Sequence, residues 1–332
     1  PNVTMPLITL ITQFGIRIGS LSLCLTLWAC TSPNPDPKVP APQSPKIQTP
    51  SPSPAPVLDA GAVTLERPED VCADCHPEAV ESFRKTAMGR SLYRPNAYPA
   101  IENFKSEVAT KAHPLMPAVY RAYIDEKGRW WQEEHVPDTD YRRRVQVEYI
   151  IGSGNHSRSY LGIVNDELVQ LPLTWYSQKR IWDFSPGYEG AGHMRFLRPV
   201  IPECLFCHNG LTHHHSGTDA QYEMPLAEGI DCTRCHGATQ AHVAQRAAGK
   251  GPPAGAADPT ILNPSRLTNK REFDVCQQCH LQGLVRVLMP GQRWDQYDPR
   301  TPLEDYLNVF GFRGIADKFE IASHAERLSK SA

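Results

Sequence analysis

The sequence lacks an excess of charge of either sign. Its 332 residues include 34 Lys and Arg against 36 Asp and Glu, which gives a formal net charge of −2 at pH 7. Nucleic acids and anionic membrane surfaces attract proteins with a basic excess. The charge balance therefore predicts no nucleic acid as partner, and charge does not decide the function.

The sequence also lacks the residue patterns of several enzyme classes. No Ser-His-Asp arrangement, pair of carboxylates or glycine-rich phosphate loop stands out, so catalysis without a cofactor has no support. Long apolar runs are missing as well. The run at residues 18–29 has 12 residues, which is too short for a comfortable membrane span.

Cysteine is the residue type that indicates the function. Eight of the ten cysteines stand in four Cys-x-x-Cys pairs, and a histidine follows the second cysteine of every pair. Two thiols at this spacing can each add to a vinyl group of one porphyrin, and the adjacent imidazole then lies under the iron as proximal ligand. The sequence therefore predicts four covalently bound haems c. The attachment residues are Cys72, Cys75, Cys204, Cys207, Cys232, Cys235, Cys276 and Cys279, and the proximal ligands are His76, His208, His236 and His280.

Paired cysteines also occur in zinc ribbons and in the disulfide frameworks of exported proteins. The separation of Cys207 and Cys232 is close to ribbon spacing. Neither of these uses requires a histidine straight after each second cysteine, whereas a histidine stands there in all four motifs. Haem attachment is therefore the interpretation that we favour.

The N-terminal segment has the pattern of an export signal. The apolar run follows Arg17 and ends at Leu27-Trp28-Ala29-Cys30, which resembles a bacterial lipoprotein cleavage site. We expect residues 1–30 to be a signal peptide of the lipoprotein type and Cys30 to carry the lipid that tethers the chain to a membrane. An uncleaved anchor helix and an ordinary signal peptide are the alternatives. The predicted location is the bacterial periplasm or the outer cell surface.

Proline marks the next boundary, since ten prolines lie between residues 33 and 56. Such a stretch forms neither helix nor sheet ladders, so we expect residues 31–60 to be an extended linker. Residues 61–332 are then a tetrahaem cytochrome c domain. Three motifs fall within residues 204–280, which is little polypeptide for three porphyrins. The predicted fold class is therefore mostly α and irregular, with a haem-packed core and a small antiparallel β-meander inserted at about residues 116–184.

The spacing of apolar residues also predicts where individual strands and helices lie. Alternating residues predict strands, and a helical spacing follows the first haem motif, with a further helix expected after the fourth. The strands are expected at residues 119–124, 129–132, 145–150, 161–164 and 168–171, and the helices at residues 78–88 and 277–287.

Several stretches resemble the multihaem cytochromes of the cytochrome c-554 family. They are residues 151–160 (Ile-Gly-Ser-Gly-Asn-His-Ser-Arg-Ser-Tyr), 203–209, 228–237, 263–267 and 275–280. The likeness runs from about residue 70 to the end. It implies partners that are redox proteins, among them other multihaem cytochromes. Such cytochromes often continue with further haem motifs past the position of Ala332, so the resemblance leaves open that the native chain carries more haems.

The resemblance also implies which residues complete the iron coordination. In such cytochromes the histidine soon after a Cys-x-x-Cys-His-Gly motif commonly ligates a different haem, and His242 has this position. His156 and His324 are similarly placed, and Met88 is the candidate ligand of the first haem. Which distal ligand serves which haem stays open. The histidines with weaker claims are His113, His135, His193, His213, His214 and His215.

Two classes of function are compatible with these haems. If every iron has two axial ligands, the chain is an electron carrier at an extracytoplasmic membrane surface, which we favour. The alternative is a multihaem oxidoreductase that acts on a small nitrogen or sulfur compound at one open haem. A lysine in place of a motif histidine would indicate a nitrite-reductase-type site, and none of the four motifs has it. No sequence feature requires a third class, a subunit that stacks haems between chains in a conducting filament.

Overall fold

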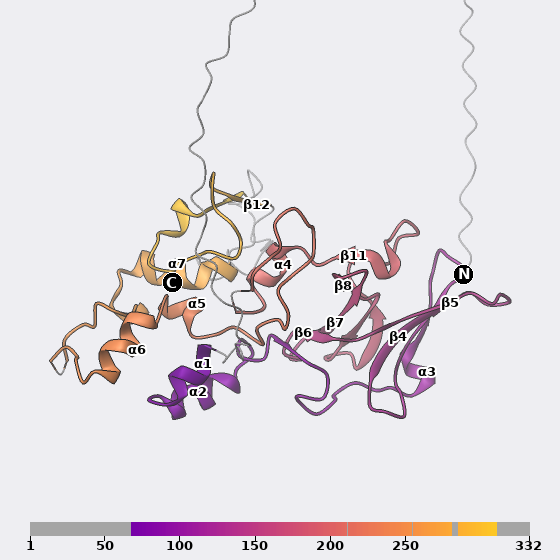
Figure 1. The fold of residues 1–332 in the computed structure, drawn as a ribbon. Helices are drawn as coiled ribbons and strands as arrows, with labels where there is room; N and C mark the ends of the chain where they lie inside the picture. Colours follow the sequence, from indigo (N-terminus) through magenta and orange to yellow (C-terminus); the bar gives the residue numbers. More distant parts are fainter. Residues whose placement is uncertain (1–67, 211, 254, 281–284, 311–332) are drawn as a thin grey trace, which may run out of the picture. The chain divides into compact units, whose positions relative to one another are not determined.

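The structure is a computed structural model that describes residues 68–310, apart from residues 211, 254 and 281–284 (Figure 1). The described residues belong to one compact unit. The predicted signal peptide with Cys30, the proline-rich linker and His324 lie outside the described residues. Within the described part of the chain, no helix has the length and apolar character that a membrane span needs.

The helices are short, and the haem motifs lie on them or at their ends. Pro77 begins α2 and Pro202 begins α4, where the fixed φ of proline favours the first helical turn. The α-helices are α1 (Pro68–Ala73), α2 (Pro77–Arg84), α3 (Ser106–Ala109), α4 (Pro202–Phe206), α5 (Thr233–His236), α6 (Gln240–Ala247) and α7 (Asn269–His280), and the 3-10 helices are η1 (Arg195–Leu197), η2 (Pro264–Arg266) and η3 (Leu303–Asp305).

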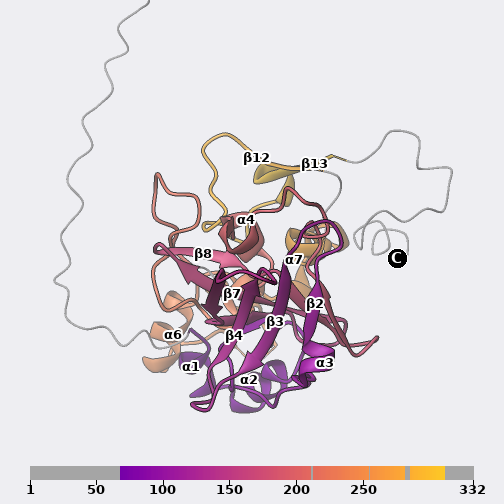
Figure 2. The same cartoon turned by 90° about the vertical axis from the view of Figure 1, so that its right-hand side faces the viewer.

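The strands pair antiparallel throughout the described residues. One sheet has the order β1-β6-β7-β8-β11, with β9 pairing β7 and β10, and a second has the order β2-β3-β4-β5. Figure 2 shows β2, β3 and β4 side by side, and β12 pairs β13 in a separate hairpin. The bounds are β1 (Leu92–Tyr93), β2 (Thr110–Ala112), β3 (Val119–Ile124), β4 (Trp130–His135), β5 (Arg142–Gln146), β6 (Tyr149–Ile151), β7 (Ser157–Val164), β8 (Glu167–Gln170), β9 (Leu173–Tyr176), β10 (Ile181–Phe184), β11 (Arg198–Pro199), β12 (Val285–Leu288) and β13 (Leu307–Phe310).

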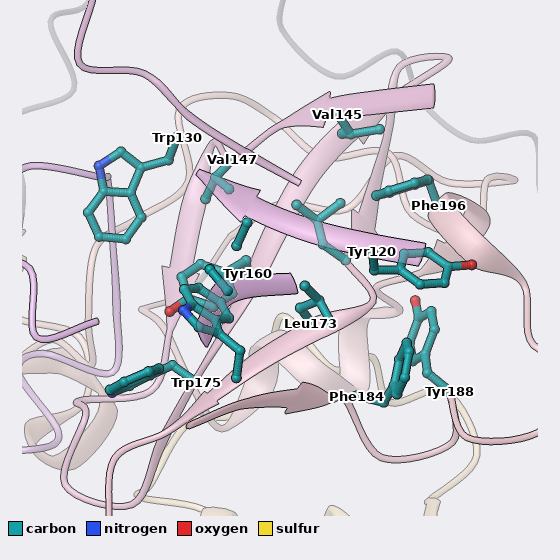
Figure 3. Packing of buried hydrophobic residues seen from close by; sticks show 14 of the residues in the cluster. Tyr120, Trp130, Val145, Val147, Tyr160, Leu173, Trp175, Phe184, Tyr188 and Phe196 are labelled. Atoms are coloured by element: carbon teal, nitrogen blue, oxygen red, sulfur yellow. The ribbon is translucent and has the colours of Figure 1, made fainter. Parts of the chain in front are cut away.

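The two larger sheets bury an aromatic core between them (Figure 3). Tyr120 and Trp130 come from one sheet and Tyr160 and Trp182 from strands paired in the other, and all four are at most 2% exposed. The ring centroids of Tyr160 and Trp182 are 5.0 Å apart. Because buried aromatic side chains remove large apolar areas from water, this cluster supplies a core made of the protein's own side chains.

Close approach of the sheets depends on two particular residues. A Cβ atom on Gly162 of β7 would lie 2.5 Å from Val145 Cγ1 of β5, so only glycine fits there. The buried Gln132 of β4 donates from Nε2 to the Leu173 carbonyl and accepts the Leu173 N–H, each at 2.8 Å. Its amide is therefore fully paired across the core, as a buried polar group requires.

The predicted fold class is wrong. Of the described residues, 23% are helical and 24% are in strands, which form several antiparallel sheets, so this part of the chain is not a mostly helical, haem-packed protein. The prediction placed the core among the porphyrins because residues 204–280 are short for three haems. The aromatic cluster between the sheets instead provides a protein core. Strands also extend beyond residues 116–184, since β1, β2 and β11 lie outside that range.

Local alternation located most of the individual strands, and the expected strand at residues 119–124 is β3. The expected helix at residues 277–287 is wrong, because α7 ends at His280 and Val285–Leu288 is strand β12. Its register partners lie about twenty residues further on, with Val285 opposite Phe310. Because the partner strand lies further along the chain, the sequence of the short segment alone does not show that it forms a strand.

A second apolar cluster connects the seven-stranded sheet to the second haem motif. Tyr149 and Leu161 of the sheet pack with Leu205 of α4, together with Tyr222 and Leu226. The Tyr149 hydroxyl accepts the Leu226 N–H at 3.0 Å, and the Tyr222 hydroxyl donates to the Val200 carbonyl. The sheet therefore holds the helix that carries Cys204 and Cys207.

We expect Trp182→Ala to lower the free energy of unfolding by roughly 3–5 kcal/mol, because it leaves a cavity in the aromatic core. Ile163→Ala is the matched control: Ile163 is 41% exposed, and its loss should cost no more than about 0.5 kcal/mol. Denaturant unfolding followed by far-ultraviolet circular dichroism measures both. If the two substitutions lowered the free energy of unfolding equally, a core formed by the protein's own side chains would be contradicted.

Candidate haem-binding sites

The first and third haem motifs line one cavity of about 420 Å³. A volume of this size lies within the range of cofactor pockets, about 300–1,000 Å³. Cys72 and His76 face it from the first motif, and Cys232, Cys235 and His236 face it from the third. Apolar side chains complete the wall, namely Ala79, Val80, Phe83 and Ile261. The folded chain thus brings together two motifs that lie about 160 residues apart in sequence.

His76 and His242 face each other beside this cavity. Their ring centroids are 6.5 Å apart and their planes differ by 19°. An imidazole nitrogen lies about 2 Å from a metal that it binds, and the ring centroid lies about 1 Å further out, so two imidazoles on opposite sides of one metal would have centroids about 6 Å apart. The separation of His76 and His242 would therefore suit two imidazoles that hold one iron.

In His242 and His236 the Nδ1 atom already has a hydrogen-bond partner. His242 Nδ1 is 2.8 Å from Asp258 Oδ2, and His236 Nδ1 is 2.8 Å from the Leu262 carbonyl. Histidines that bind a metal usually donate their other ring N–H to a carboxylate or a carbonyl. In both residues Nε2 is therefore the nitrogen left for iron.

Asp258 is held as a carboxylate by its neighbours. Hydrogen bonds from Thr260, and further bonds from His242 and Arg246, keep the pKa of Asp258 well below its ordinary value. The carboxylate is consequently charged at every pH at which the protein is expected to work. It can accept the His242 N–H and strengthen that imidazole as a ligand.

Glycine is required straight after the third motif. Gly237 has φ 73° and ψ −164°, a backbone region that is essentially restricted to glycine. Its N–H donates to the Thr233 carbonyl at 2.9 Å and so caps α5, which ends at His236. The chain can then turn into α6, which carries His242.

The second motif faces a different cavity, of about 520 Å³, beside the seven-stranded sheet. Cys204, Cys207 and His208 line it from the motif, and Arg198 and Arg286 give it positive charge. Its polar lining also includes Ser157, Ser159, Gln170 and Glu203. Among the described residues that line this cavity, His208 is the only histidine and there is no methionine.

His208 has the protonation state that a metal ligand needs. Burial and the nearby charge of Arg286 lower the pKa of His208, so its ring is neutral at pH 7. Neutral imidazole is the form that binds metals.

The fourth motif, at the end of α7, packs against both the second and the third. Gln278, which is 2% exposed, donates from Nε2 to the Arg234 carbonyl of the third motif at 2.8 Å. The thiol of Cys207 is 3.7 Å from the Cys279 carbonyl, and the thiol of Cys279 is 3.8 Å from the Phe206 carbonyl. The attachment cysteines of the second and fourth motifs are thus in contact.

Two arginines surround this contact, and sequence reasoning missed both. Arg286 Nη1 is 3.2 Å from Cys207 Sγ, and the guanidinium carbon of Arg234 is 4.3 Å from the centre of the Phe206 ring. The contact with Cys279 and the charges of Arg286 and Arg234 lower the pKa of the Cys207 thiol in the chain before haem attachment. Arg234 is a variable position within its motif and Arg286 lies in none, so no spacing rule identifies them.

In the described part of the chain, the structure places one of the four predicted distal ligands opposite a motif histidine. The structure brings His242 to the first motif, as described above. His156 is exposed, its Nδ1 is 2.8 Å from Gln178 Nε2, and it lines neither of the two cavities. Met88 is 46% exposed and lines neither cavity as well. His324 lies outside the described part of the chain.

The weaker histidine candidates serve other contacts. His113 is buried among the aromatic side chains of the β-sheets and bonds the Tyr188 carbonyl at 2.9 Å. His193 Nε2 is 3.5 Å from the Tyr120 hydroxyl, and His214 lies in a bridge with Tyr222. None of these three histidines lines either of the two cavities.

The residues present fit haem c. Two cavities of suitable volume each carry a Cys-x-x-Cys-His motif, one pair of imidazoles has the spacing of axial ligands, and the outer nitrogens of His242 and His236 are engaged as in metal sites. No three His, Cys, Asp or Glu side chains among the described residues converge as a zinc ribbon would require. The class of protein that these sites define is a multihaem cytochrome c.

Comparison with known proteins agrees with this class. Residues 191–237, which contain the second and third motifs, match the family model described as cytochrome c554 and c-prime. The resemblance to the cytochrome c-554 family is therefore confirmed over this segment. No curated protein shows significant similarity to the chain.

One solved structure is similar to the chain, the outer cell wall cytochrome OcwA. The identity is 17% and the TM-score is 0.45. The similarity covers 75% of this chain and 46% of that chain, so the protein spans less than half the length of this relative.

Proposed function

We propose that the chain is an electron carrier with four covalently bound haems c. Cys72 and Cys75, Cys204 and Cys207, Cys232 and Cys235, and Cys276 and Cys279 attach them, and His76, His208, His236 and His280 are the proximal ligands. The observation that carries the proposal is the contact of each motif with another, because electrons pass between haems only where the haems are neighbours. When bound, the haems supply reversible one-electron chemistry.

The contacts between motifs indicate a path that differs from the sequence order. The first and third motifs share one cavity, the third and fourth are joined by Gln278 and Arg234, and the fourth and second meet at Cys279 and Cys207. We propose that electrons travel along the haems of the first, third, fourth and second motifs, in this order or its reverse.

The chain's own residues define the axial coordination at the first motif. We propose that His76 and His242 bind the same iron, in place of the Met88 ligand expected from the sequence. Asp258 orients His242 through Nδ1, and Gly237 lets the backbone turn so that α6 can present it. Two imidazoles make this haem a site for electron transfer only, since no axial position is left for a substrate.

The proposed setting is extracytoplasmic and lipid-anchored. The support is the sequence pattern that ends at Cys30 and the proline-rich linker at residues 31–60, which would hold the haem-bearing unit away from the membrane. Redox proteins, including other multihaem cytochromes, are the partners proposed on the family resemblance.

The exported, haem-loaded protein should contain four haems per chain by the pyridine haemochrome assay and by intact mass. It should accept four electrons in a titration with dithionite. Replacing both cysteines of any one motif by serine should remove one haem and one electron from these totals. A chain that binds fewer than four haems, or that binds zinc in stoichiometric amounts instead, would contradict the proposal.

A second candidate function is chemistry on a small anion at the second motif. The cavity there is lined by Arg198 and Arg286, and the described residues lining it offer no distal histidine or methionine opposite His208. A haem with an open axial position can bind a small molecule. Nitrogen and sulfur oxyanions are the compounds to test, because the two arginines favour negative charge.

Carbon monoxide binding tests both axial assignments. We expect the reduced protein to bind carbon monoxide at the second motif, and we expect this signal to disappear in a variant with Cys204 and Cys207 replaced by serine. His242→Ala should add one carbon monoxide-binding haem per chain, because it opens the iron at the first motif. Absence of binding in the unchanged protein would eliminate the second candidate and leave the carrier function. An unchanged stoichiometry in His242→Ala would contradict the ligand pair.

A further inference from the structure

The contact between the second and fourth motifs holds an excess of buried positive charge. Arg286 has a side chain that is 10% exposed, and Arg234 is 3% exposed. Arg286 Nη1 is 3.2 Å from Cys207 Sγ, and Arg234 Nη2 donates to the carbonyl of the preceding residue, Phe206. Charges that are removed from water interact strongly with their neighbours and are only weakly screened by salt.

One carboxylate balances this charge only in part. Glu203 Oε1 accepts from Arg286 Nε and Nη2, each at 3.0 Å. Arg234 has no carboxylate partner among the described residues, and its Nε is buried without an acceptor. Arg234 Nη2 donates to the Phe206 carbonyl, and Asp295, whose side chain is 6% exposed, lines a small cavity together with Arg234 and Phe206. Arg286 is therefore the guanidinium group that acts most directly at the attachment sulfur of Cys207.

The cavity between the first and third motifs has the opposite electrostatic character. Its described lining contains the buried Asp231 and no lysine or arginine. Asp231 accepts bonds from Thr233 Oγ1 and the Arg234 N–H, so the acid is fixed in place. The cavity of the first and third motifs is thus lined by an acid, whereas Arg286 contacts the second motif.

We propose that Arg286 makes the second and fourth motifs the high-potential end of the electron path. Reduction adds one electron to a haem iron as its donor is oxidised, and a nearby buried cation stabilises the reduced form. Arg286 does so most directly, since it contacts the attachment sulfur Cys207. Electrons that enter at the first and third motifs are then drawn toward the second and fourth. The inference rests on the proposed electron-carrier function and adds a direction to it.

Two substitutions at the ion pair of Arg286 and Glu203 test the inference, because one removes a positive charge and the other removes a negative charge. In a potentiometric titration of the full haem-loaded chain, followed by optical and EPR spectra, Arg286→Met should lower the midpoints of the two highest-potential transitions and leave the other two unchanged. Arg286→Lys should retain the midpoints of the unchanged protein. Glu203→Gln should shift the same two transitions upward, because it removes the compensating carboxylate. Arg142→Met, at a side chain that is 65% exposed on β5, is the control that should shift nothing.

The outcomes separate this inference from the function on which it rests. Unchanged midpoints in both Arg286→Met and Glu203→Gln, or shifts of the same sign in both, would overturn the inference while four electrons per chain still supported the carrier. Loss of haem from the unchanged protein would overturn the carrier itself. If Arg286→Met fails to load haem, Glu203→Gln alone decides, since an upward shift of two transitions supports the inference and no shift contradicts it.

Discussion

The contact of three haem motifs around Arg234 and Phe206 is the constraint on which the haem-bearing half of the protein depends. Arg234 of the third motif packs on the Phe206 ring of the second, and its carbonyl accepts from Gln278 of the fourth. Aromatic packing, a buried hydrogen bond and a buried charge thus act at one point. Because the motifs meet in this way, haems attached to them must be neighbours, which is the requirement for electron transfer along the chain.

The β-sheets supply both a core and a surface that supports the second haem motif. Their aromatic cluster forms a core without any cofactor, and the outer face of the seven-stranded sheet packs against α4. The second motif is therefore attached to a rigid surface, whereas the first motif depends on helices and on the His76 and His242 pair. This difference explains why the cavity at the second motif has polar strand residues such as Ser157 and Ser159 in its wall.

Sequence reasoning succeeded where a chemical rule acts over a few residues. Strand β3 follows from local alternation and is confirmed. The assignment of the motif cysteines and histidines rests on a fixed spacing and stays a prediction. Sequence reasoning failed where distant segments decide the outcome. The strand at Val285–Leu288 depends on pairing with β13, and the balance between helix and strand depends on how two sheets close over one another. The roles of Arg234 and Arg286 could not be predicted either, because only the folded chain brings the motifs around them together.

A structure of the haem-loaded protein, by crystallography or electron cryomicroscopy, would show which haems are neighbours. We expect neighbouring irons to belong to the first and third, the third and fourth, and the fourth and second motifs, with His76 and His242 on one iron. Irons that follow one another in sequence order, or His76 and His242 on separate irons, would contradict this expectation.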